Sequence, residues 1–169
     1  MKALVVYDCE TSTKCTEQVA KTIADGLKAK IGDVVCQPIS DCKLSSLKDY
    51  DCIVIGSPTI YRQPTRAVTS LFEQLQQMKL LGMMNPGGKA SAAFGTLSPN
   101  WSWQGGNSAQ VIEAKMKELN LNVMVPAFAA KVNLKGDYDY SLAEGEIAKA
   151  QTFASDLANA LAGKPSAAK

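Results

Sequence analysis

The first thirty residues of the chain constrain its fold more than any other stretch. Residues 3–7 (ALVVY) form an apolar run typical of a buried β-strand, and residues 19–27 carry apolar side chains at helical spacing. Between them, the segment 8–16 (DCETSTKCT) has four hydroxyl side chains within six residues. The order is therefore strand, hydroxyl-rich loop and helix. Because the first N–H groups of a helix lack intrahelical partners and the helix dipole favours negative charge, this loop is a candidate phosphate site.

The composition is that of an ordinary globular domain. The chain has 169 residues, of which 46% are hydrophobic and 20% charged. A domain of this length buries roughly 70% of its unfolded surface and needs no disulfide or metal to fold. Its apolar runs are far shorter than the ~20 residues of a membrane span, and the N-terminus does not resemble a signal peptide. We therefore expect one cytoplasmic domain over residues 1–162, followed by a flexible tail over 163–169.

The absence of histidine from the sequence excludes several kinds of catalytic site. Ser–His and Cys–His nucleophiles, histidine general bases and His-ligated metal centres all need that side chain. The five cysteines fit no zinc or iron–sulfur spacing, so we expect reduced thiols and no metal. Cys36 and Cys52 are expected in the core, whereas Cys9 and Cys15 flank the hydroxyl-rich loop and are candidates for redox sensitivity. The scattered basic residues and the net charge of +2 do not indicate nucleic-acid binding.

Strands and helices alternate along the rest of the chain. Further strands are predicted at 34–39, 52–56, 89–95 and, with a bend at Pro126, 123–132. A further helix is predicted to begin at Pro64, and another to cover 109–119. The last helix is predicted to begin at a capping box at 141–144 and to end at about Leu161. This alternation predicts an α/β fold with a doubly wound, five-stranded parallel sheet. Ligands bind such sheets outside the carboxyl ends of the strands, so we expect a cleft where the loops 8–16, 57–63 and 95–107 meet.

These three loops resemble the cofactor loops of the flavodoxin family. The segment 11–17 (TSTKCTE) resembles the phosphate loop, whose usual form is T/S-x-T-G-x-T before a helix. The segments 56–61 (GSPTIY) and 94–106 (FG at its start, WQGG at its end) look like the two flavin-ring loops. The resemblance covers residues 2–162. Within the family, the chain is most similar to the flavodoxin domain of archaeal and clostridial A-type flavoproteins. This resemblance implies a flavodoxin-like fold with strand order 2-1-3-4-5 and non-covalently bound FMN.

The chain departs from the family pattern at several positions. Lys14 stands where the phosphate loop usually has glycine, which adds a positive charge but also a Cβ that limits φ > 0. Ile60 or Tyr61 must serve in place of the usual ring-loop aromatic. Residues 97–101 (LSPNW) form an unusual insertion, and the chain is slightly basic where flavodoxins are usually strongly acidic.

The resemblance implies a particular set of cofactor-binding residues. The phosphate is expected to bind hydroxyls and backbone N–H groups of the first loop: Glu10, Thr11, Ser12, Thr13, Lys14, Cys15 and Thr16. The flavin ring is expected to stack on Ile60 or Tyr61 and on Trp101 or Trp103. The remaining contacts are expected from the second and third loops: Ser57, Pro58, Thr59, Arg62, Gly95, Thr96, Leu97, Gly105 and Gly106. Tyr138 and Tyr140 are candidates for loop packing or for the rim of the site.

The resemblance also implies a function. It is that of a low-potential electron carrier with the role of a ferredoxin in anaerobic metabolism, with redox proteins as partners and no catalytic residue of its own. We expect a monomer or weak homodimer with no nucleic-acid or membrane partner. Arg62, a cation in the ring loop, is expected to make the second reduction potential less negative than in acidic flavodoxins. For one electron, about 59 mV corresponds to a tenfold change in the equilibrium.

Other functions of this fold class remain alternatives to weigh. An FMN-dependent quinone reductase that uses NAD(P)H is the main alternative, with residues 96–107 as its substrate pocket. A phospho-receiver domain is disfavoured because Ser57, rather than an aspartate, follows the third strand. An A-type oxygen or NO reductase is disfavoured because its di-iron domain requires histidine.

Overall fold

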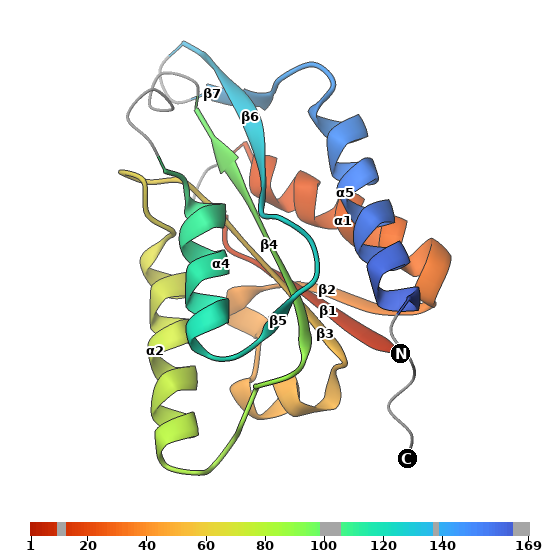
Figure 1. Ribbon diagram of the computed structural model, residues 1–169. Helices are drawn as coiled ribbons and strands as arrows, with labels where there is room; N and C mark the ends of the chain where they lie inside the picture. The colour runs from red at the N-terminus through yellow and green to blue at the C-terminus, as the bar shows by residue number, and fades with distance from the viewer. Residues whose placement is uncertain (10–12, 99–105, 137–138, 164–169) are drawn as a thin grey trace.

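The chain folds into a layered α/β structure, seen in a computed structural model that describes residues 1–9, 13–98, 106–136 and 139–163 (Figure 1). The first half contains β1 (Lys2–Tyr7), α1 (Cys15–Ile31), β2 (Asp33–Pro38), the 3₁₀ helices η1 (Ile39–Asp41) and η2 (Leu44–Asp49), β3 (Cys52–Pro58) and α2 (Arg66–Leu80). The second half contains β4 (Ala90–Leu97), α4 (Ser108–Glu118), β5 (Asn122–Val123), β6 (Phe128–Lys135), β7 (Asp139–Leu142) and α5 (Glu146–Ala162). Among these described residues, no helix has the length and apolar content needed to cross a membrane.

The sheet has the predicted strand order. The strands lie in the order β2-β1-β3-β4-β6-β7, and β5 pairs with the other end of β4. All pairs are parallel except β6 with β7. Because β5 and β6 together occupy the fifth place, the order 2-1-3-4-5 is confirmed.

The predicted count of five strands is wrong, since the described residues form seven. The fifth strand is interrupted at 124–127, where Pro126 cannot donate a ladder hydrogen bond, so it appears as β5 and β6. The other unpredicted strand is β7, which pairs antiparallel with the end of β6. Its segment was predicted to be a loop and the start of a helix.

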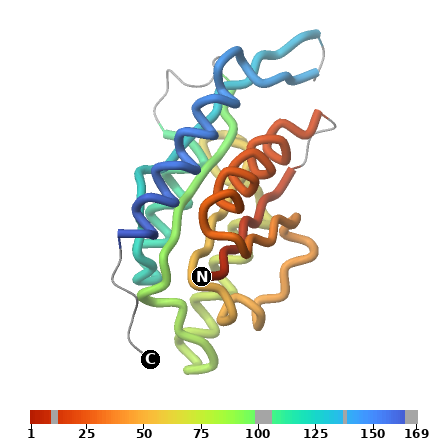
Figure 2. Tube along the Cα trace, turned by 90° about the vertical axis from the view of Figure 1, so that its right-hand side faces the viewer, coloured from red at the N-terminus to blue at the C-terminus, as the bar shows by residue number. Residues whose placement is uncertain are grey.

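Two apolar layers enclose the sheet. Alternate residues of β1 face opposite sides: Ala3 and Val5 pack under α1 and α5, whereas Leu4 and Val6 pack under α2 and α4. Helices α1 and α5 run side by side, as Figure 2 shows. They approach closely at Gly26, where an added Cβ would lie 2.7 Å from Ala154 Cβ. The central strands are therefore buried on both faces, and only the strand ends and their loops are open to a ligand.

The predicted start of the helix after β3 is wrong by two residues. Pro64 was expected at the first helical position, but Thr65 is the N-cap and α2 begins at Arg66. The Thr65 hydroxyl accepts a hydrogen bond from the Val68 N–H at 3.5 Å. A hydroxyl that can cap the helix thus takes the boundary position, and the proline lies just before it.

The predicted capping box at 141–144 is also wrong, because Ser141 belongs to β7 and α5 begins later, at Glu146. Gly145 precedes the helix in the left-handed conformation (φ 80°). The Glu146 side chain is 2% exposed and accepts hydrogen bonds from the Lys131 N–H (3.1 Å) and from Lys149 Nζ (2.7 Å). This carboxylate therefore ties the start of α5 to strand β6. The helix ends at Ala162, and the predicted tail falls largely on residues 164–169, outside the described residues.

Candidate cofactor site

A hollow lies at the carboxyl end of the parallel strands. It encloses about 120 Å³ and is lined by Cys15, Pro58, Thr59, Ile60, Thr96, Ser98, Val132 and Tyr140. These residues come from the start of α1, the ends of β3 and β4, and the β6–β7 hairpin. The first five were predicted as cofactor contacts, so described parts of all three predicted loops meet at one edge of the sheet.

Six of the predicted contacts cannot be placed. Glu10, Thr11, Ser12, Trp101, Trp103 and Gly105 lie outside the described residues, as does Tyr138. The hollow formed by the described residues is smaller than the roughly 300–1,000 Å³ of typical ligand pockets. This volume is bounded by described residues alone, and the segments 10–12 and 99–105 lie outside them.

The start of α1 has the geometry of an anion site. Lys14, the residue before the helix, adopts the left-handed conformation (φ 52°, ψ 30°), which costs roughly 1–2 kcal/mol for a residue with a Cβ. The lysine thus takes the backbone conformation that glycine adopts without strain. Among the described residues, no side chain caps this helix. The N–H groups of its first turn can therefore donate to a bound anion.

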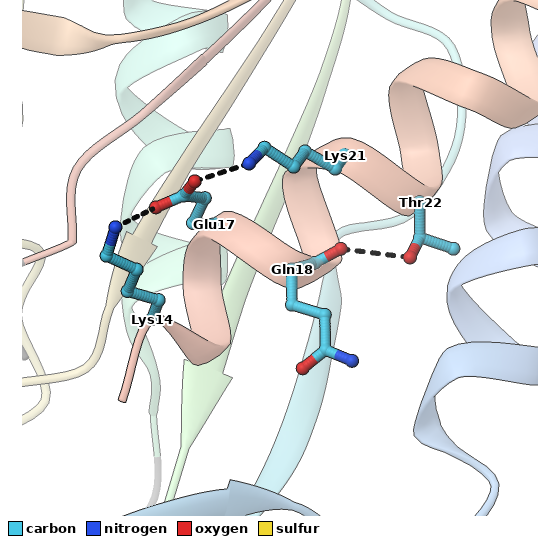
Figure 3. Close-up of polar contacts among 5 residues, drawn as sticks. All are labelled: Lys14, Glu17, Gln18, Lys21 and Thr22. Carbon is cyan, nitrogen blue, oxygen red and sulfur yellow. Dashed lines mark hydrogen bonds and ion pairs between the residues drawn. The ribbon is translucent and has the colours of Figure 1, made fainter. Parts of the chain in front are cut away.

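Lys14 forms an ion pair with Glu17, which lies in the first turn of α1. Glu17 lies 3.7 Å from Lys14 Nζ and 2.5 Å from Lys21 Nζ, as Figure 3 shows. The hydrogen bond from Lys21 lowers the pKa of Glu17, and the charge of Lys14 lowers it further. Both lysine side chains are more than 60% exposed, so these pairs add little to stability. Glu17 nevertheless offsets part of the positive charge that the sequence places beside the loop.

A pair of threonines joins α1 to β4 beside the hollow. Thr16 is 1% exposed, and its hydroxyl shares a hydrogen bond of 2.9 Å with the hydroxyl of Thr96. The backbone oxygen of Thr96 accepts a hydrogen bond from the Thr59 N–H at 2.9 Å. The Thr16 hydroxyl was predicted to bind the phosphate, whereas Thr96 was predicted as a contact of the third loop; here the two hydroxyls bond to each other. The pair therefore fixes the relative position of the first and third loops.

The loop after β3 contains a tight turn of two bulky residues. Tyr61 (φ 46°) and Arg62 (φ 68°) are both left-handed, and Ile60 and Gln63 exchange two backbone hydrogen bonds of 2.9 Å. This is the pattern of a type I′ hairpin turn, which usually contains Asn-Gly because both central residues need positive φ. Ile60 lines the hollow, whereas Tyr61 is 85% exposed. Of the two predicted ring contacts in this loop, the structure brings Ile60 to the hollow.

Buried hydroxyl groups hold the base of this loop against α4. Ser57 is fully buried; its hydroxyl accepts from the Thr65 N–H (2.9 Å) and donates to the Pro58 oxygen (2.8 Å). The Ser108 hydroxyl donates to the backbone oxygen of Ser57 at 2.8 Å and accepts from the Thr59 hydroxyl at 2.9 Å. Ser57 and Thr59 thus have structural hydrogen bonds in addition to their predicted place in the site.

Gly95 makes this arrangement possible. A Cβ at this position would lie 2.4 Å from Ser108 Oγ and 2.9 Å from the Ser57 oxygen. The glycine of the third loop therefore lets the start of α4 approach β4. Of the other predicted contacts in this loop, Leu97 is half-buried at the end of β4, and Gly106 (φ 94°) precedes the helix.

Three lining residues were not predicted as contacts. Ser98 lies in the segment treated as an insertion, Tyr140 was considered for loop packing or for the rim, and Val132 was predicted as the end of a strand. The alternation of apolar residues at 132 and 134, and again at 140 and 142, around Gly136 is the signal that could have identified the hairpin.

Cys15, which lines the hollow, is not activated by its surroundings. Cys15 is buried, and its thiol hydrogen is shared between the Tyr140 backbone oxygen at 3.5 Å and the Thr13 hydroxyl at 3.8 Å. Burial raises the pKa of Cys15, which lowers the fraction of reactive thiolate and opposes the predicted redox sensitivity. Cys52 is in the core as predicted, whereas Cys36 is only half-buried. Within the described ranges, no group of three or more His, Cys, Asp or Glu side chains could hold a metal.

The described groups fit a phosphorylated aromatic ligand. The N–H groups of the first turn of α1 suit a phosphate, and Pro58, Ile60 and Val132 offer apolar contacts to a ring. A doubly wound sheet with such a site at the carboxyl ends of its strands defines the class of mononucleotide-binding α/β proteins.

Sequence comparison identifies the family within this class. The sequence model of flavodoxins matches residues 5–147, and the chain belongs to the flavodoxin family. Proteins of this family bind FMN and transfer electrons, which assigns FMN as the cofactor of this chain. No protein among the curated sequences matches the chain.

Solved structures of similar fold include flavodoxins and a larger enzyme. A flavodoxin from the domain Archaea is 28% identical with a TM-score of 0.69, over 94% of this chain and 97% of that one. Flavodoxin 1 from Bacillus cereus is 16% identical with a TM-score of 0.75, over 94% and 98% of the two chains. Rubredoxin oxygen:oxidoreductase from Desulfovibrio gigas is 22% identical with a TM-score of 0.75. The similarity to that enzyme covers 98% of this chain but only 37% of the enzyme.

Proposed function

We propose that this protein is a carrier of single electrons that works between redox proteins at low potential. The observation that carries the proposal is the hollow formed by the start of α1 and the ends of β3 and β4 in a chain of the flavodoxin family. FMN, when bound there, supplies reversible one-electron chemistry. The protein's own task is to hold the cofactor, limit the access of water to it and set its potential.

The phosphate is held at the N-terminus of α1. The N–H groups of residues 15–17 and the hydroxyl of Thr13 donate to it, together with the predicted loop donors Thr11 and Ser12, and Glu10 is proposed to lie beside them. Each hydrogen bond to a charged group contributes roughly 1.5–3 kcal/mol. Several such bonds hold the cofactor without a dedicated cation, which is consistent with the pairing of Lys14 to Glu17.

The ring is held between apolar side chains of the second and third loops. Ile60 and Pro58 contribute one side, and Trp101 or Trp103 is proposed for the other. Stacking on an aromatic ring adds roughly 0.5–1.5 kcal/mol beyond burial. Backbone groups of Thr59 and of residues 95–97 are proposed to meet the polar edge of the ring.

Arg62 is proposed to raise the second reduction potential. It lies in the tight turn that follows Ile60, and a cation near the ring favours the reduced, anionic cofactor. Because Arg62 is exposed, solvent and salt screen its charge, so the effect is at most about 59 mV, or tenfold in the equilibrium. Replacement of Arg62 by Gln is expected to make the second potential more negative, and an unchanged potential at low salt would rule this role out.

The carrier function is tested by comparing electron donors. We expect the purified protein to bind FMN, to be reduced in two separate one-electron steps in an anaerobic redox titration, and to react slowly with NADH and NADPH. Ile60→Ala is expected to weaken FMN binding, measured by quenching of flavin fluorescence. Met83→Ala is the matched control, because Met83 is 69% exposed and follows α2 at the opposite edge of the sheet. Rapid flavin bleaching by a nicotinamide cofactor would instead support the reductase alternative.

The state of the cysteines supports a proposal for the cellular compartment of the protein. Cys15, Cys36 and Cys42 carry thiols that form no disulfide, and such thiols are typical of proteins in a reducing compartment. A cytoplasmic carrier with protein partners is therefore the proposed setting. Localisation of the tagged protein by cell fractionation tests this part independently of its redox properties.

A further inference from the structure

The β6–β7 hairpin extends beyond the sheet at the edge that carries the hollow. Strand β6 pairs with β4 only over Phe128–Lys131, and β4 ends at Leu97. Residues 132–135 continue past that end and pair with β7 instead. Figure 2 shows the hairpin projecting from the end of the molecule where β4 terminates. The hairpin therefore stands beside the hollow as a wall that the three cofactor loops do not supply.

One face of the hairpin is apolar. Residues directly opposite each other in an antiparallel pair project to the same side of the sheet. Val132 is opposite Leu142, and Leu134 is opposite Tyr140, so all four side chains share one face. Ala130, which precedes them in the same alternation, lies in the core under α1 and α5. The apolar face thus turns toward the side of the sheet that holds the start of α1.

Contacts with α1 and α5 fix the hairpin. Cys15, the first residue of α1, donates its thiol hydrogen to the backbone oxygen of Tyr140 at 3.5 Å. At the base, the Ala143 N–H donates to the Lys131 oxygen at 2.9 Å, and Leu142 packs against the core. Val132 is only 6% exposed. The wall is therefore joined to the same helix start that is proposed to hold the phosphate.

We propose that this hairpin forms a fourth wall of the FMN site, in which Tyr140 contacts the flavin or ribityl part of the cofactor. Val132 and Tyr140 line the hollow and present mainly apolar surface, which suits a ring or a carbon chain rather than a phosphate. Cys15 is the positioning residue that keeps Tyr140 in place. The inference rests on the proposed location of FMN in this hollow.

The test measures the affinity of the apoprotein for two ligands, FMN and riboflavin. Tyr140→Ala is expected to weaken both by about tenfold, which corresponds to about 1.4 kcal/mol. Tyr140→Phe retains the ring and is expected to stay within about threefold of the parent. Asn133→Ala is the matched control, because Asn133 lies in the same hairpin on the opposite face and is exposed. It is expected to leave both affinities unchanged.

The possible failures are distinguishable. A parent protein that binds neither ligand overturns the proposed function itself. A parent that binds FMN, together with a Tyr140→Ala variant of unchanged affinity, overturns the wall alone. An equal loss in Tyr140→Ala and Asn133→Ala also overturns it, because a general disturbance of the hairpin would then explain both. Loss of FMN affinity with unchanged riboflavin affinity places Tyr140 at the phosphate, which contradicts the proposal.

The role of Cys15 is tested by a double-mutant cycle with Tyr140. Cys15→Ala removes the thiol and its bond to the Tyr140 backbone oxygen. It is expected to weaken riboflavin binding about threefold to fivefold. In the Tyr140→Ala background the same change is expected to have a smaller effect, because the side chain that Cys15 positions is gone. Equal effects in the two backgrounds would refute the positioning role. Thermal unfolding of each apoprotein shows whether the variant remains folded.

Discussion

Gly95 offers the sharpest test of how the structure builds the site. In Gly95→Ala, the new Cβ would lie 2.4 Å from Ser108 Oγ, a separation that real Cβ atoms essentially never show, and 2.9 Å from the Ser57 oxygen. Ser108 cannot simply rotate away, because its hydroxyl donates to the Ser57 oxygen and accepts from Thr59. The change therefore forces either α4 or the loop after β3 to move.

The expected cost follows from these contacts. Overpacking a well-packed interior typically costs about 1–3 kcal/mol. Loss of the buried hydrogen bond from Ser108 to Ser57 adds about 1–3 kcal/mol if the groups are left without partners. We therefore expect Gly95→Ala to lower the free energy of unfolding of the apoprotein by about 2–6 kcal/mol. FMN affinity should fall as well, because Pro58 and Thr59 line the hollow.

Urea denaturation of the apoprotein provides the measurement. With an m-value of about 2 kcal/mol/M, a loss of about 3 kcal/mol moves the midpoint down by roughly 1.5 M. Gly163→Ala is the control, since a Cβ there would lie 3.6 Å from its nearest neighbour, the Asn159 oxygen, which is an ordinary contact. Its midpoint should remain close to that of the parent.

A second substitution isolates the cause. Ser108→Ala removes the oxygen that the new Cβ would meet, so Gly95→Ala should cost at least about 1 kcal/mol less in that background. Additive effects within about 0.5 kcal/mol would refute the proposed clash. A midpoint for Gly95→Ala equal to that of the Gly163→Ala control would refute the whole argument.

Three further predictions concern individual buried or paired groups. Ser91 Oγ is buried and has no hydrogen-bond partner among the described residues, so Ser91→Ala should raise stability by about 1 kcal/mol and the thermal midpoint by about 2–4 °C; a lower midpoint contradicts this. The hydrogen bonds from Lys117 and from the Ala127 N–H hold the pKa of Glu113 below its usual 4.5. This stabilisation is present above pH 4.5 and is lost as the pH falls through the folded-state pKa, so Glu113→Gln should be destabilising in urea at pH 7 and less so at pH 3. A difference independent of pH would show that the carboxylate charge is not involved. Burial raises the pKa of Cys36 to about 11, so about one thiol in a thousand is ionised at pH 8. Alkylation of Cys36, followed by mass spectrometry, should be much slower in the folded protein than in urea, and equal rates would contradict its burial.

The parts of the site that the sequence predicted are those that local patterns encode. The apolar runs that became β1 and β3 indicated buried parallel strands, and the residues that follow them were therefore expected at one edge. Cys15, Pro58 and Thr96 indeed line one hollow there. The boundary errors at Pro64 and in the segment 141–144 arose because a proline and a capping pattern are only short-range signals. The hydrogen bonds of Thr65 and the pairing of β7 determined those boundaries instead.

The sequence by itself determined the order of strands and helices, the family of the chain and the loops that form the site, because apolar periodicity and short motifs act over a few neighbouring residues. Only the tertiary structure decided which side chains stand beside one another. The bond between Thr16 and Thr96 joins residues 80 positions apart, and that between Cys15 and Tyr140 joins residues 125 apart. Such pairs leave no local pattern, since their partners meet only when the sheet has assembled. The hairpin wall beside the hollow is therefore a property of the folded protein rather than of any single segment.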